Sequence, residues 1–261
     1  MVIFFDIDGT IIDNETQIIP ESTLRAVKAL GEKGHLAVVN TGRPFAHIDP
    51  RIREMAFGGW VCGCGMEIRL GGGWLYRRCP GPEVCAEIRK AVLECGMQVL
   101  YEAQDGAVYT DGAHSLHPEI LRETAGMRKK GFHVGDISEL PGPAFMKLIT
   151  YDWPGCRREE FISRVGERFH CIDRGDTMLE LVLKDCSKAK GMEELLEHLG
   201  VPRAETFAIG DSTNDLPMFS VAGTGICMGN GMAELKEKAD FVTESVLDDG
   251  IEKALKHYSL I

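Results

Sequence analysis

The chain has 261 residues, which is enough for one large domain, or for a domain with a smaller second unit, around apolar cores. Its formal net charge of −11 argues against a nucleic-acid-binding protein, because the phosphates of nucleic acids require a basic surface. A phosphorylated small molecule would therefore have to be met by local cations or by a metal ion.

The N-terminal run Met1–Phe5 is apolar and is followed directly by Asp6. It has no basic stretch before it and is too short for a signal peptide or a membrane span, so it predicts a buried strand. The nine cysteines form no Cys-x-x-Cys pair, which is typical of thiols in a reducing compartment. We therefore expect a cytoplasmic protein with no membrane partner.

Three short apolar runs, at 2–5, 36–39 and 206–209, each end in a polar turn that contains glycine. Continuous rather than alternating apolar strands indicate a parallel sheet that is covered on both faces. Amphipathic segments at 21–33 and 188–199 predict helices that end at glycines. The order strand, helix, strand predicts an α/β fold with a doubly wound, Rossmann-like parallel core sheet.

The middle of the chain has a different pattern. After Gly71-Gly72-Gly73, which marks a turn, strands and helices follow in an order that predicts a second, smaller α/β domain with antiparallel hairpins. Strands are expected at 74–77, 98–102, 107–110, 145–151 and 178–183, and helices at 82–95, 118–130 and 157–169. We expect a discontinuous core domain of residues 1–78 and 185–261, with residues 79–184 forming the inserted domain.

In open α/β sheets, ligands bind beyond the carboxyl ends of the strands. Asp6 and Asp8, Thr41, and Asp211 all follow the predicted core strands, so their side chains should converge. Carboxylates suit Mg²⁺, and they can lie beside a phosphate only if a cation neutralises them. One carboxylate could attack phosphorus while its neighbour exchanges a proton with the departing alcohol, and the Thr41 hydroxyl could contact phosphate oxygens.

Lys188 gives an independent indication. Ser187 is a good N-cap, so Lys188 and Lys190 open the helix at 188–199, where cations oppose the helix dipole. A phosphate at this position would be held by Lys188 and by the free backbone N–H groups. We interpret Lys190 as a solvated surface lysine.

Four motifs stand in order along the chain: Asp6-Ile7-Asp8-Gly9-Thr10, Thr41-Gly42-Arg43, Ser187-Lys188 and Gly210-Asp211-Ser212-Thr213-Asn214-Asp215. Together they resemble the motifs of the haloacid dehalogenase superfamily, most closely those of its Cof-like phosphatases, which insert an α/β cap between the second and third motifs. One departure is visible: relatives often carry Asn-Gly at the strand end where this chain has Cys64-Gly65.

The resemblance implies a role for each matching position. Asp6 would be the nucleophile that forms an aspartyl-phosphate, and Asp8 the general acid/base, which also lends its main-chain carbonyl to Mg²⁺. The phosphate-binding residues would be Thr41, Gly42, Lys188 and Asn214, and the Mg²⁺ ligands Asp6, Asp8, Asp211 and Asp215. The cap would select the substrate.

The sequence thus predicts a Mg²⁺-dependent phosphatase acting on a small phosphorylated metabolite, such as a sugar phosphate or a phosphorylated cofactor. Two alternatives remain open: a phosphosugar mutase, and a non-catalytic protein of the same fold that binds a phosphometabolite. The intact set of Asp6, Asp8, Lys188 and Asp211 weighs against the non-catalytic protein. We expect a monomer or a weak homodimer.

Overall fold

The computed structural model describes residues 1–140, 142, 144–175 and 177–261. These residues divide into two compact units. The core unit comprises Met1–Arg77 and Ser187–Ile261, and the inserted unit comprises Arg78–Cys186. The inserted unit expected from the sequence, 79–184, starts one residue later and ends two residues earlier than this.

The core unit is built on an eight-stranded sheet in the order β14-β13-β12-β1-β2-β3-β4-β5. The first six strands of this order run parallel, and β4 and β5 extend the edge as antiparallel strands. The strands are β1 (Val2–Phe5), β2 (Leu36–Asn40), β3 (Gly59–Cys62), β4 (Glu67–Leu70), β5 (Gly73–Arg77), β12 (Thr206–Gly210), β13 (Thr224–Cys227) and β14 (Phe241–Val242). The predicted doubly wound parallel core is therefore confirmed.

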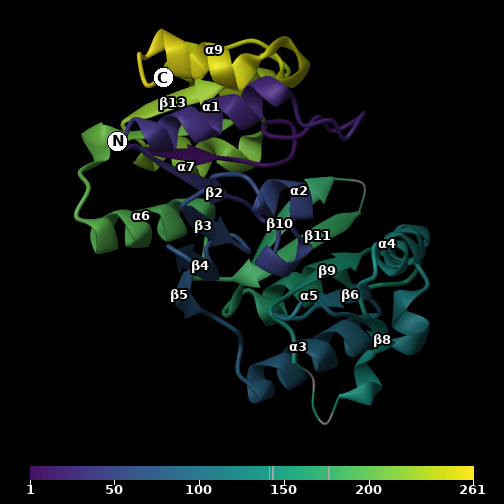
Figure 1. Ribbon diagram of the computed structural model, residues 1–261. Coiled ribbons are helices and arrows are strands. Elements are labelled where there is room, and N and C mark those ends of the chain that lie inside the picture. The colour runs from purple at the N-terminus through teal and green to yellow at the C-terminus, as the bar shows by residue number, and fades with distance from the viewer. Residues whose placement is uncertain (141, 143, 176) are drawn as a thin grey trace. The chain divides into compact units, whose positions relative to one another are not determined.

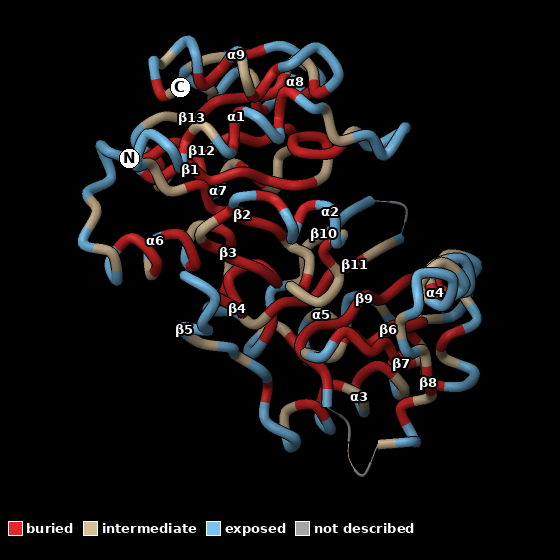
Figure 2. The backbone as a smooth tube through the Cα atoms, viewed as in Figure 1, coloured by how far each residue is buried: buried red, intermediate tan, exposed pale blue. Residues whose placement is uncertain are grey.

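Alternate residues of β1 enter different layers, which explains its continuous apolar sequence. Ile3 and Phe5 pack in the layer that contains α1 and α9, whereas Val2 and Phe4 pack with α6 and α7. Figures 1 and 2 show helices on both sides of this sheet and the buried strands between them. The helices of the core unit are α1 (Glu21–Glu32), α2 (Pro50–Arg53), α6 (Lys188–Leu199), α7 (Leu216–Val221), α8 (Ala233–Lys236) and α9 (Gly250–His257).

The inserted unit contains a six-stranded sheet in the order β10-β11-β9-β6-β7-β8. Helices α3 and α5 pack on one face, in the apolar cluster of Tyr101 and Leu148, and α4 packs on the other face with Leu100 and Ile149. Its elements are α3 (Pro82–Cys95), β6 (Gln98–Glu102), β7 (Val108–Thr110), α4 (Pro118–Lys129), β8 (Val134–Asp136), β9 (Lys147–Tyr151), α5 (Arg158–Val165), β10 (Phe169–Gly175) and β11 (Met178–Leu183).

The helix expected at 157–169 is too long in the prediction. Helix α5 ends at Val165, and Phe169 is the first residue of β10, which pairs antiparallel with β11. Phe169 is buried in the apolar cluster of the inserted unit, so burial against the sheet decides its conformation. The remaining short 3-10 helices are η1 (Phe45–His47), η2 (Gly112–Ser115), η3 (Ile137–Glu139), η4 (Arg203–Glu205), η5 (Thr213–Asp215) and η6 (Val246–Asp248).

Two glycines place the first turn of α6 against the end of β3. A Cβ added to Gly191 would lie 2.5 Å from Cγ1 of Val61 and 2.8 Å from Cα of Gly65. A Cβ added to Gly65 would lie 2.5 Å from the carbonyl oxygen of Ser187. Side chains at Gly65 and Gly191 would therefore push α6, and with it Lys188, away from the sheet.

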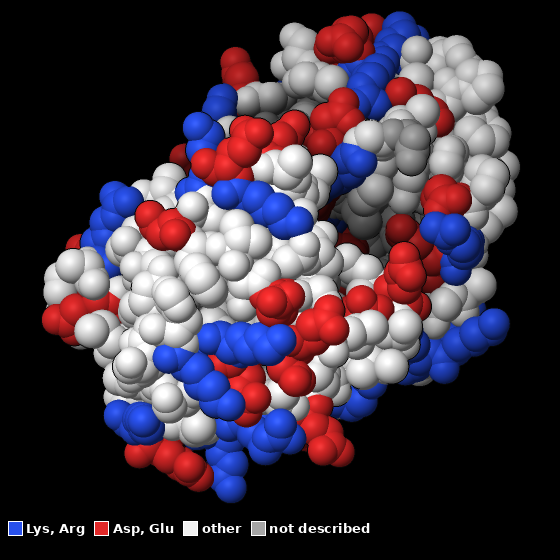
Figure 3. Space-filling model, turned by 90° about the horizontal axis from the view of Figure 1, so that it is seen from above, with Lys and Arg blue, Asp and Glu red and all other residues white. Residues whose placement is uncertain are grey.

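Charged side chains of both signs share the surface of the protein. On the face shown in Figure 3, Lys and Arg residues are interspersed with Asp and Glu residues. Among the residues described above, no helix is both long enough and apolar enough to cross a lipid bilayer.

Candidate active site

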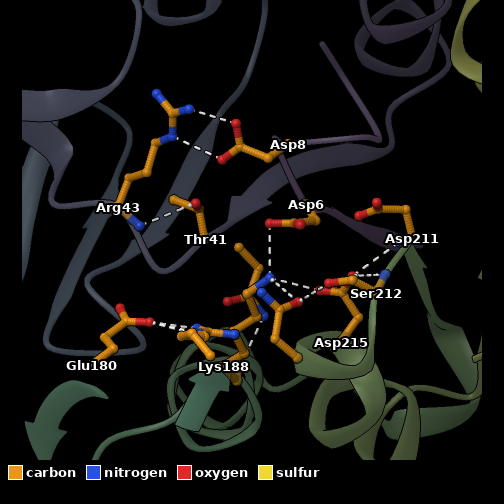
Figure 4. Close-up of polar contacts among 12 residues, drawn as sticks. Asp6, Asp8, Thr41, Arg43, Glu180, Lys188, Asp211, Ser212 and Asp215 are labelled. Carbon is orange, nitrogen blue, oxygen red and sulfur yellow. Dashed lines mark hydrogen bonds and ion pairs between the residues drawn. The ribbon is translucent and has the colours of Figure 1, made fainter. Parts of the chain in front are cut away.

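The loops that follow β1, β2 and β12 carry the candidate catalytic residues. These strands are neighbours in the parallel sheet, so their carboxyl ends meet at one edge. Asp6 directly follows β1, and its backbone N–H continues the ladder by donating to the carbonyl of Ile209 in β12 at 3.0 Å. Figure 4 shows Asp6, Thr41 and Asp211 gathered at this edge, with Lys188 reaching in from the start of α6.

Three buried carboxylates lie close together there. One carboxylate oxygen from each of Asp6, Asp211 and Asp215 lies within 4.8 Å of the others. Burial, followed by the negative charge of Asp215, raises the pKa of Asp6 to about 7, and the positive charge of Lys188 only partly opposes this. Burial and the charges of Asp6 and Asp215 likewise raise the pKa of Asp211 to about 7. The cluster holds more negative charge than Lys188 alone can compensate.

The carboxylate cluster fits a divalent cation. Asp211 is only 8% exposed, and its Oδ1 is buried without a hydrogen-bond partner among the described residues. Burying a carboxylate oxygen without a hydrogen-bond partner is costly. Such an oxygen is a suitable ligand for a hard divalent cation. Gly9 packs directly against this side chain, since a Cβ there would lie 2.1 Å from Oδ2 of Asp211.

Lys188 is the first residue of α6 and is buried, with its ammonium group inside the cluster. Its Nζ lies 2.8 Å from Oδ1 of Asp6 and 2.6 Å from Oδ1 of Asp215. Burial alone would lower the pKa of Lys188, but the two carboxylates raise it above its usual value. Ser187 caps the helix by accepting from the N–H of Lys190, as expected, and Lys190 itself is exposed.

Asp215 holds the loop that carries Asp211. Its Oδ2 accepts from the backbone N–H groups of Asp211 at 3.0 Å and Ser212 at 3.2 Å. Because its Oδ1 accepts from Lys188, both oxygens of Asp215 already have partners. Asn214 lies beside this group, and its Oδ1 accepts from Lys188 at 3.3 Å and from Ser212 Oγ at 2.8 Å. The structure thus brings Asn214 and Asp215 to the same site as Lys188.

Thr41 and Gly42 directly follow β2, on the other side of β1 from Asp211. The Thr41 side chain is buried, and its Oγ1 accepts from the backbone N–H of Arg43 at 3.2 Å. A hydroxyl that accepts this hydrogen bond can direct its own proton toward a phosphate oxygen. Cys64 lies next to this turn, since its N–H donates to the carbonyl of Thr41 at 3.1 Å. Its φ of 54° is one that asparagine adopts more readily than most residues.

The side chain of Asp8 has a partner that the sequence analysis did not identify. Nε and Nη2 of Arg43 donate to Oδ2 and Oδ1 of Asp8 at 2.8 and 2.5 Å. Figure 4 shows this pair apart from the contacts made by Lys188. The sequence did offer one indication of this pair, because Arg43 lies in the turn after Thr41, which was expected to converge with Asp6 and Asp8. A second missed residue is Asn230, whose Nδ2 donates to the carbonyl of Gly9 at 2.8 Å and so supports the Asp6–Gly9 turn.

Comparisons with known proteins agree with this fold. The family model of the haloacid dehalogenase-like hydrolases matches residues 3–255. "Putative phosphatase YkrA" of Bacillus subtilis (strain 168) is 32% identical over 262 residues, covering 100% of this chain and 98% of YkrA. An "HMP-PP phosphatase" of Klebsiella pneumoniae (strain 342) is 30% identical over 264 residues, and the match covers 97% of this chain and 92% of that protein.

A solved structure is also similar over the full length. BT1666 from Bacteroides thetaiotaomicron, described among phosphatases of the same superfamily, superposes with a TM-score of 0.84 at 26% identity, covering 100% of this chain and 95% of its own. The family model alone spans nearly the whole chain, and the predicted resemblance is confirmed. The chain belongs to the haloacid dehalogenase-like hydrolases.

Proposed function

We propose that this protein is a Mg²⁺-dependent phosphatase that hydrolyses small phosphomonoesters through an aspartyl-phosphate on Asp6. The observation that carries this proposal is the position of the Asp6 carboxylate, which has the ammonium of Lys188 at 2.8 Å and the buried carboxylate of Asp211 beside it. A nucleophilic oxygen between a fixed cation and a metal site is the arrangement that phosphoryl transfer needs, because positioning and charge neutralisation lower its barrier.

Mg²⁺ would be held by Asp6, Asp8, Asp211 and Asp215. Asp8 would contribute its main-chain carbonyl, and Asp215 would act through the loop that it supports. When bound, Mg²⁺ supplies positive charge that offsets the carboxylates and the phosphate. Because Asp211 Oδ1 has no hydrogen-bond partner among the described residues, it is the oxygen best prepared for this role.

In the first step an oxygen of Asp6 bonds to phosphorus while the bond from phosphorus to the leaving oxygen breaks. Asp8 gives its proton to that oxygen, so an alcohol leaves. In the second step Asp8 takes a proton from a water molecule as the water oxygen bonds to phosphorus. The bond between phosphorus and Asp6 then breaks, which returns Asp6 and frees inorganic phosphate. Lys188, Thr41, Gly42 and Asn214 hold the phosphoryl oxygens in both steps.

The names of the relatives support a phosphorylated metabolite as substrate, and the "HMP-PP phosphatase" shows that one relative is named for a specific metabolite. Sugar phosphates and phosphorylated cofactors are the substrate classes we infer, with the inserted unit selecting among them. A cytoplasmic location, a monomeric or weakly dimeric state, and the absence of nucleic-acid and membrane partners remain predictions from the sequence.

The test is release of inorganic phosphate from p-nitrophenyl phosphate and from a panel of phosphorylated metabolites, with Mg²⁺ and with EDTA. We expect release only with Mg²⁺ and none from Asp6→Asn. Asp13→Asn is the matched control, because Asp13 lies on the same loop but hydrogen-bonds Thr16. Wild-type protein that releases no phosphate from any substrate would favour a non-catalytic binding protein. Isomerisation of a hexose phosphate without free phosphate would favour a mutase.

A further inference from the structure

The carboxylate of Asp8 is oriented by a single side chain. Among the residues that the structure describes, Arg43 alone donates hydrogen bonds to it, through Nε to Oδ2 and through Nη2 to Oδ1. We propose that Arg43 is a positioning residue for proton transfer, which sets the orientation of the Asp8 carboxylate toward the leaving oxygen. This inference rests on the proposed function, since it assigns a task within the same reaction.

The backbone around Asp8 is fixed without Arg43. The backbone of Asp8 forms an isolated parallel β-bridge with that of Ile12, and the N–H of Gly9 donates to the carbonyl of Ile12 at 2.9 Å. These contacts set where the Asp8 side chain begins, but they leave its two side-chain torsions open. A carboxylate that must reach one particular oxygen needs a further constraint, because catalysis is sensitive to errors of about 1 Å.

The main chain of Arg43 is anchored, and the negative charge of Asp6 also attracts its guanidinium, so Arg43 can supply that constraint. Its N–H donates to Oγ1 of Thr41 at 3.2 Å, and its carbonyl accepts from the N–H of Gly63 at 2.8 Å. The guanidinium is planar and offers two parallel donors, so a bidentate pair fixes the plane of the carboxylate as well as its distance. Arg43 thereby joins the phosphate-binding turn after β2 to the acid/base after β1.

The pair is not part of the buried core. The side chains of Arg43 and Asp8 are 35% and 41% exposed, and an ion pair with this exposure contributes little to folding stability. Its geometry is nevertheless that of a complete fork. A contact of this kind, at the residue proposed to move a proton, is better explained by orientation than by stabilisation.

The experiment separates proton transfer from phosphate binding by the choice of leaving group. p-Nitrophenolate leaves without needing a proton, whereas the alkoxide of glycerol 2-phosphate needs one. The value of kcat/KM reports the steps up to the transfer of phosphoryl to Asp6. For Arg43→Gln we expect kcat/KM to fall about 10- to 100-fold with glycerol 2-phosphate, which is part of the rate enhancement that general acid catalysis supplies. With p-nitrophenyl phosphate we expect kcat/KM to stay within about threefold of the wild-type value.

Three further variants sharpen the result. Arg43→Lys keeps the positive charge but cannot form the bidentate contact, so we expect the same loss with glycerol 2-phosphate only. This variant also tests the inference if Arg43→Gln does not fold. In the background of Asp8→Asn, Arg43→Gln should cause no additional loss with glycerol 2-phosphate. The control is Arg25→Gln, because the side chain of Arg25 is exposed, pairs with Glu21 and Glu252 in the same unit, and should leave both rates unchanged.

Equal losses with both substrates would overturn the inference, since they would show that Arg43 acts on phosphate binding. Full activity of Arg43→Lys would also overturn it, because charge alone would then suffice. Neither result would touch the proposed function, which is tested separately by phosphate release from the full panel of substrates, by EDTA and by Asp6→Asn.

Discussion

Lys188 places its ammonium group 2.8 Å from Oδ1 of Asp6, although the two residues lie in distant parts of the chain. Lys188 opens α6 and Asp6 follows β1, so the contact depends on how α6 packs against the sheet. The close approach of Gly65 and Gly191 makes that packing possible. The pair is the electrostatic centre of the site, because Lys188 is the cation that touches both Asp6 and Asp215.

Replacing Lys188 by methionine should abolish most of the activity. In the proposed reaction Lys188 orients Asp6 and neutralises the transferring group, so we expect its loss to lower kcat about 10²- to 10³-fold. Steady-state phosphate release measures it. Lys190→Met is the matched control, because Lys190 is exposed in the same turn and should keep the wild-type rate. A Lys188→Met variant with wild-type kcat would remove Lys188 from the reaction.

Asp211→Asn should weaken Mg²⁺ binding more than any other single change at the site. The amide keeps the size of the side chain but loses the charge on Oδ1, which has no hydrogen-bond partner in the part of the chain that the structure describes. Isothermal titration calorimetry with MgCl₂, in the absence of substrate, measures the effect. We expect Kd to rise about 10- to 100-fold, which corresponds to about 1.4–2.8 kcal/mol. An unchanged Kd would place the metal elsewhere.

The metal-free protein should become less stable as pH rises through 7. The folded-state pKa values of Asp6 and Asp211 are raised to about 7 from 3.8, so the folded state binds more protons than the unfolded state between these values. Their contribution to stability is therefore fully present below pH 4 and is lost as pH rises through about 7. Each proton changes the free energy of unfolding by about 1.4 kcal/mol per pH unit at most.

Urea unfolding in EDTA between pH 5 and pH 8 measures this dependence. Other titrating groups also contribute, so the quantity of interest is the difference between wild type and Asp211→Asn, in which one carboxyl cannot ionise. The variant should lose less stability over this range than the wild type does. Mg²⁺ should stabilise the wild type more at pH 8 than at pH 5. Equal slopes in the two proteins would show that Asp211 ionises normally without metal.

Gly9→Ala should disable the site through Asp211. A Cβ at position 9 would lie 2.1 Å from Oδ2 of Asp211, and the φ of Gly9 is +76°. Gly34 is the matched control, because its φ is +78° but nothing lies within 4 Å of its added Cβ. In each variant the positive φ alone should cost about 1 kcal/mol of stability.

Only Gly9→Ala should lower Mg²⁺ affinity and phosphate release, by about 10-fold or more, because only there must the carboxylate of Asp211 move. Calorimetry and the phosphate assay check both effects. If the two alanine variants behaved alike, backbone strain rather than displacement of Asp211 would be the cause.

Much of the core could be predicted from local patterns. The runs at 2–5, 36–39 and 206–209 are apolar throughout because parallel strands are buried on both faces, and the helix at 188–199 has the same bounds in the structure. The same patterns failed at 157–169, where helix α5 gives way to β10. There the apolar spacing suits both a helix face and a strand, and pairing with β11 decides between them.

The sequence by itself determined which residues stand at the carboxyl ends of the core strands, because strand and turn signals are local. It could not determine which charges touch. That Asp8 pairs with Arg43, that Lys188 lies between Asp6 and Asp215, and that Asp211 keeps a buried oxygen without a hydrogen-bond partner among the described residues are decided by the tertiary structure. The physical reason is that an ion pair or a metal site depends on differences of 1–2 Å between distant segments, which only the packing of helices on the sheet sets.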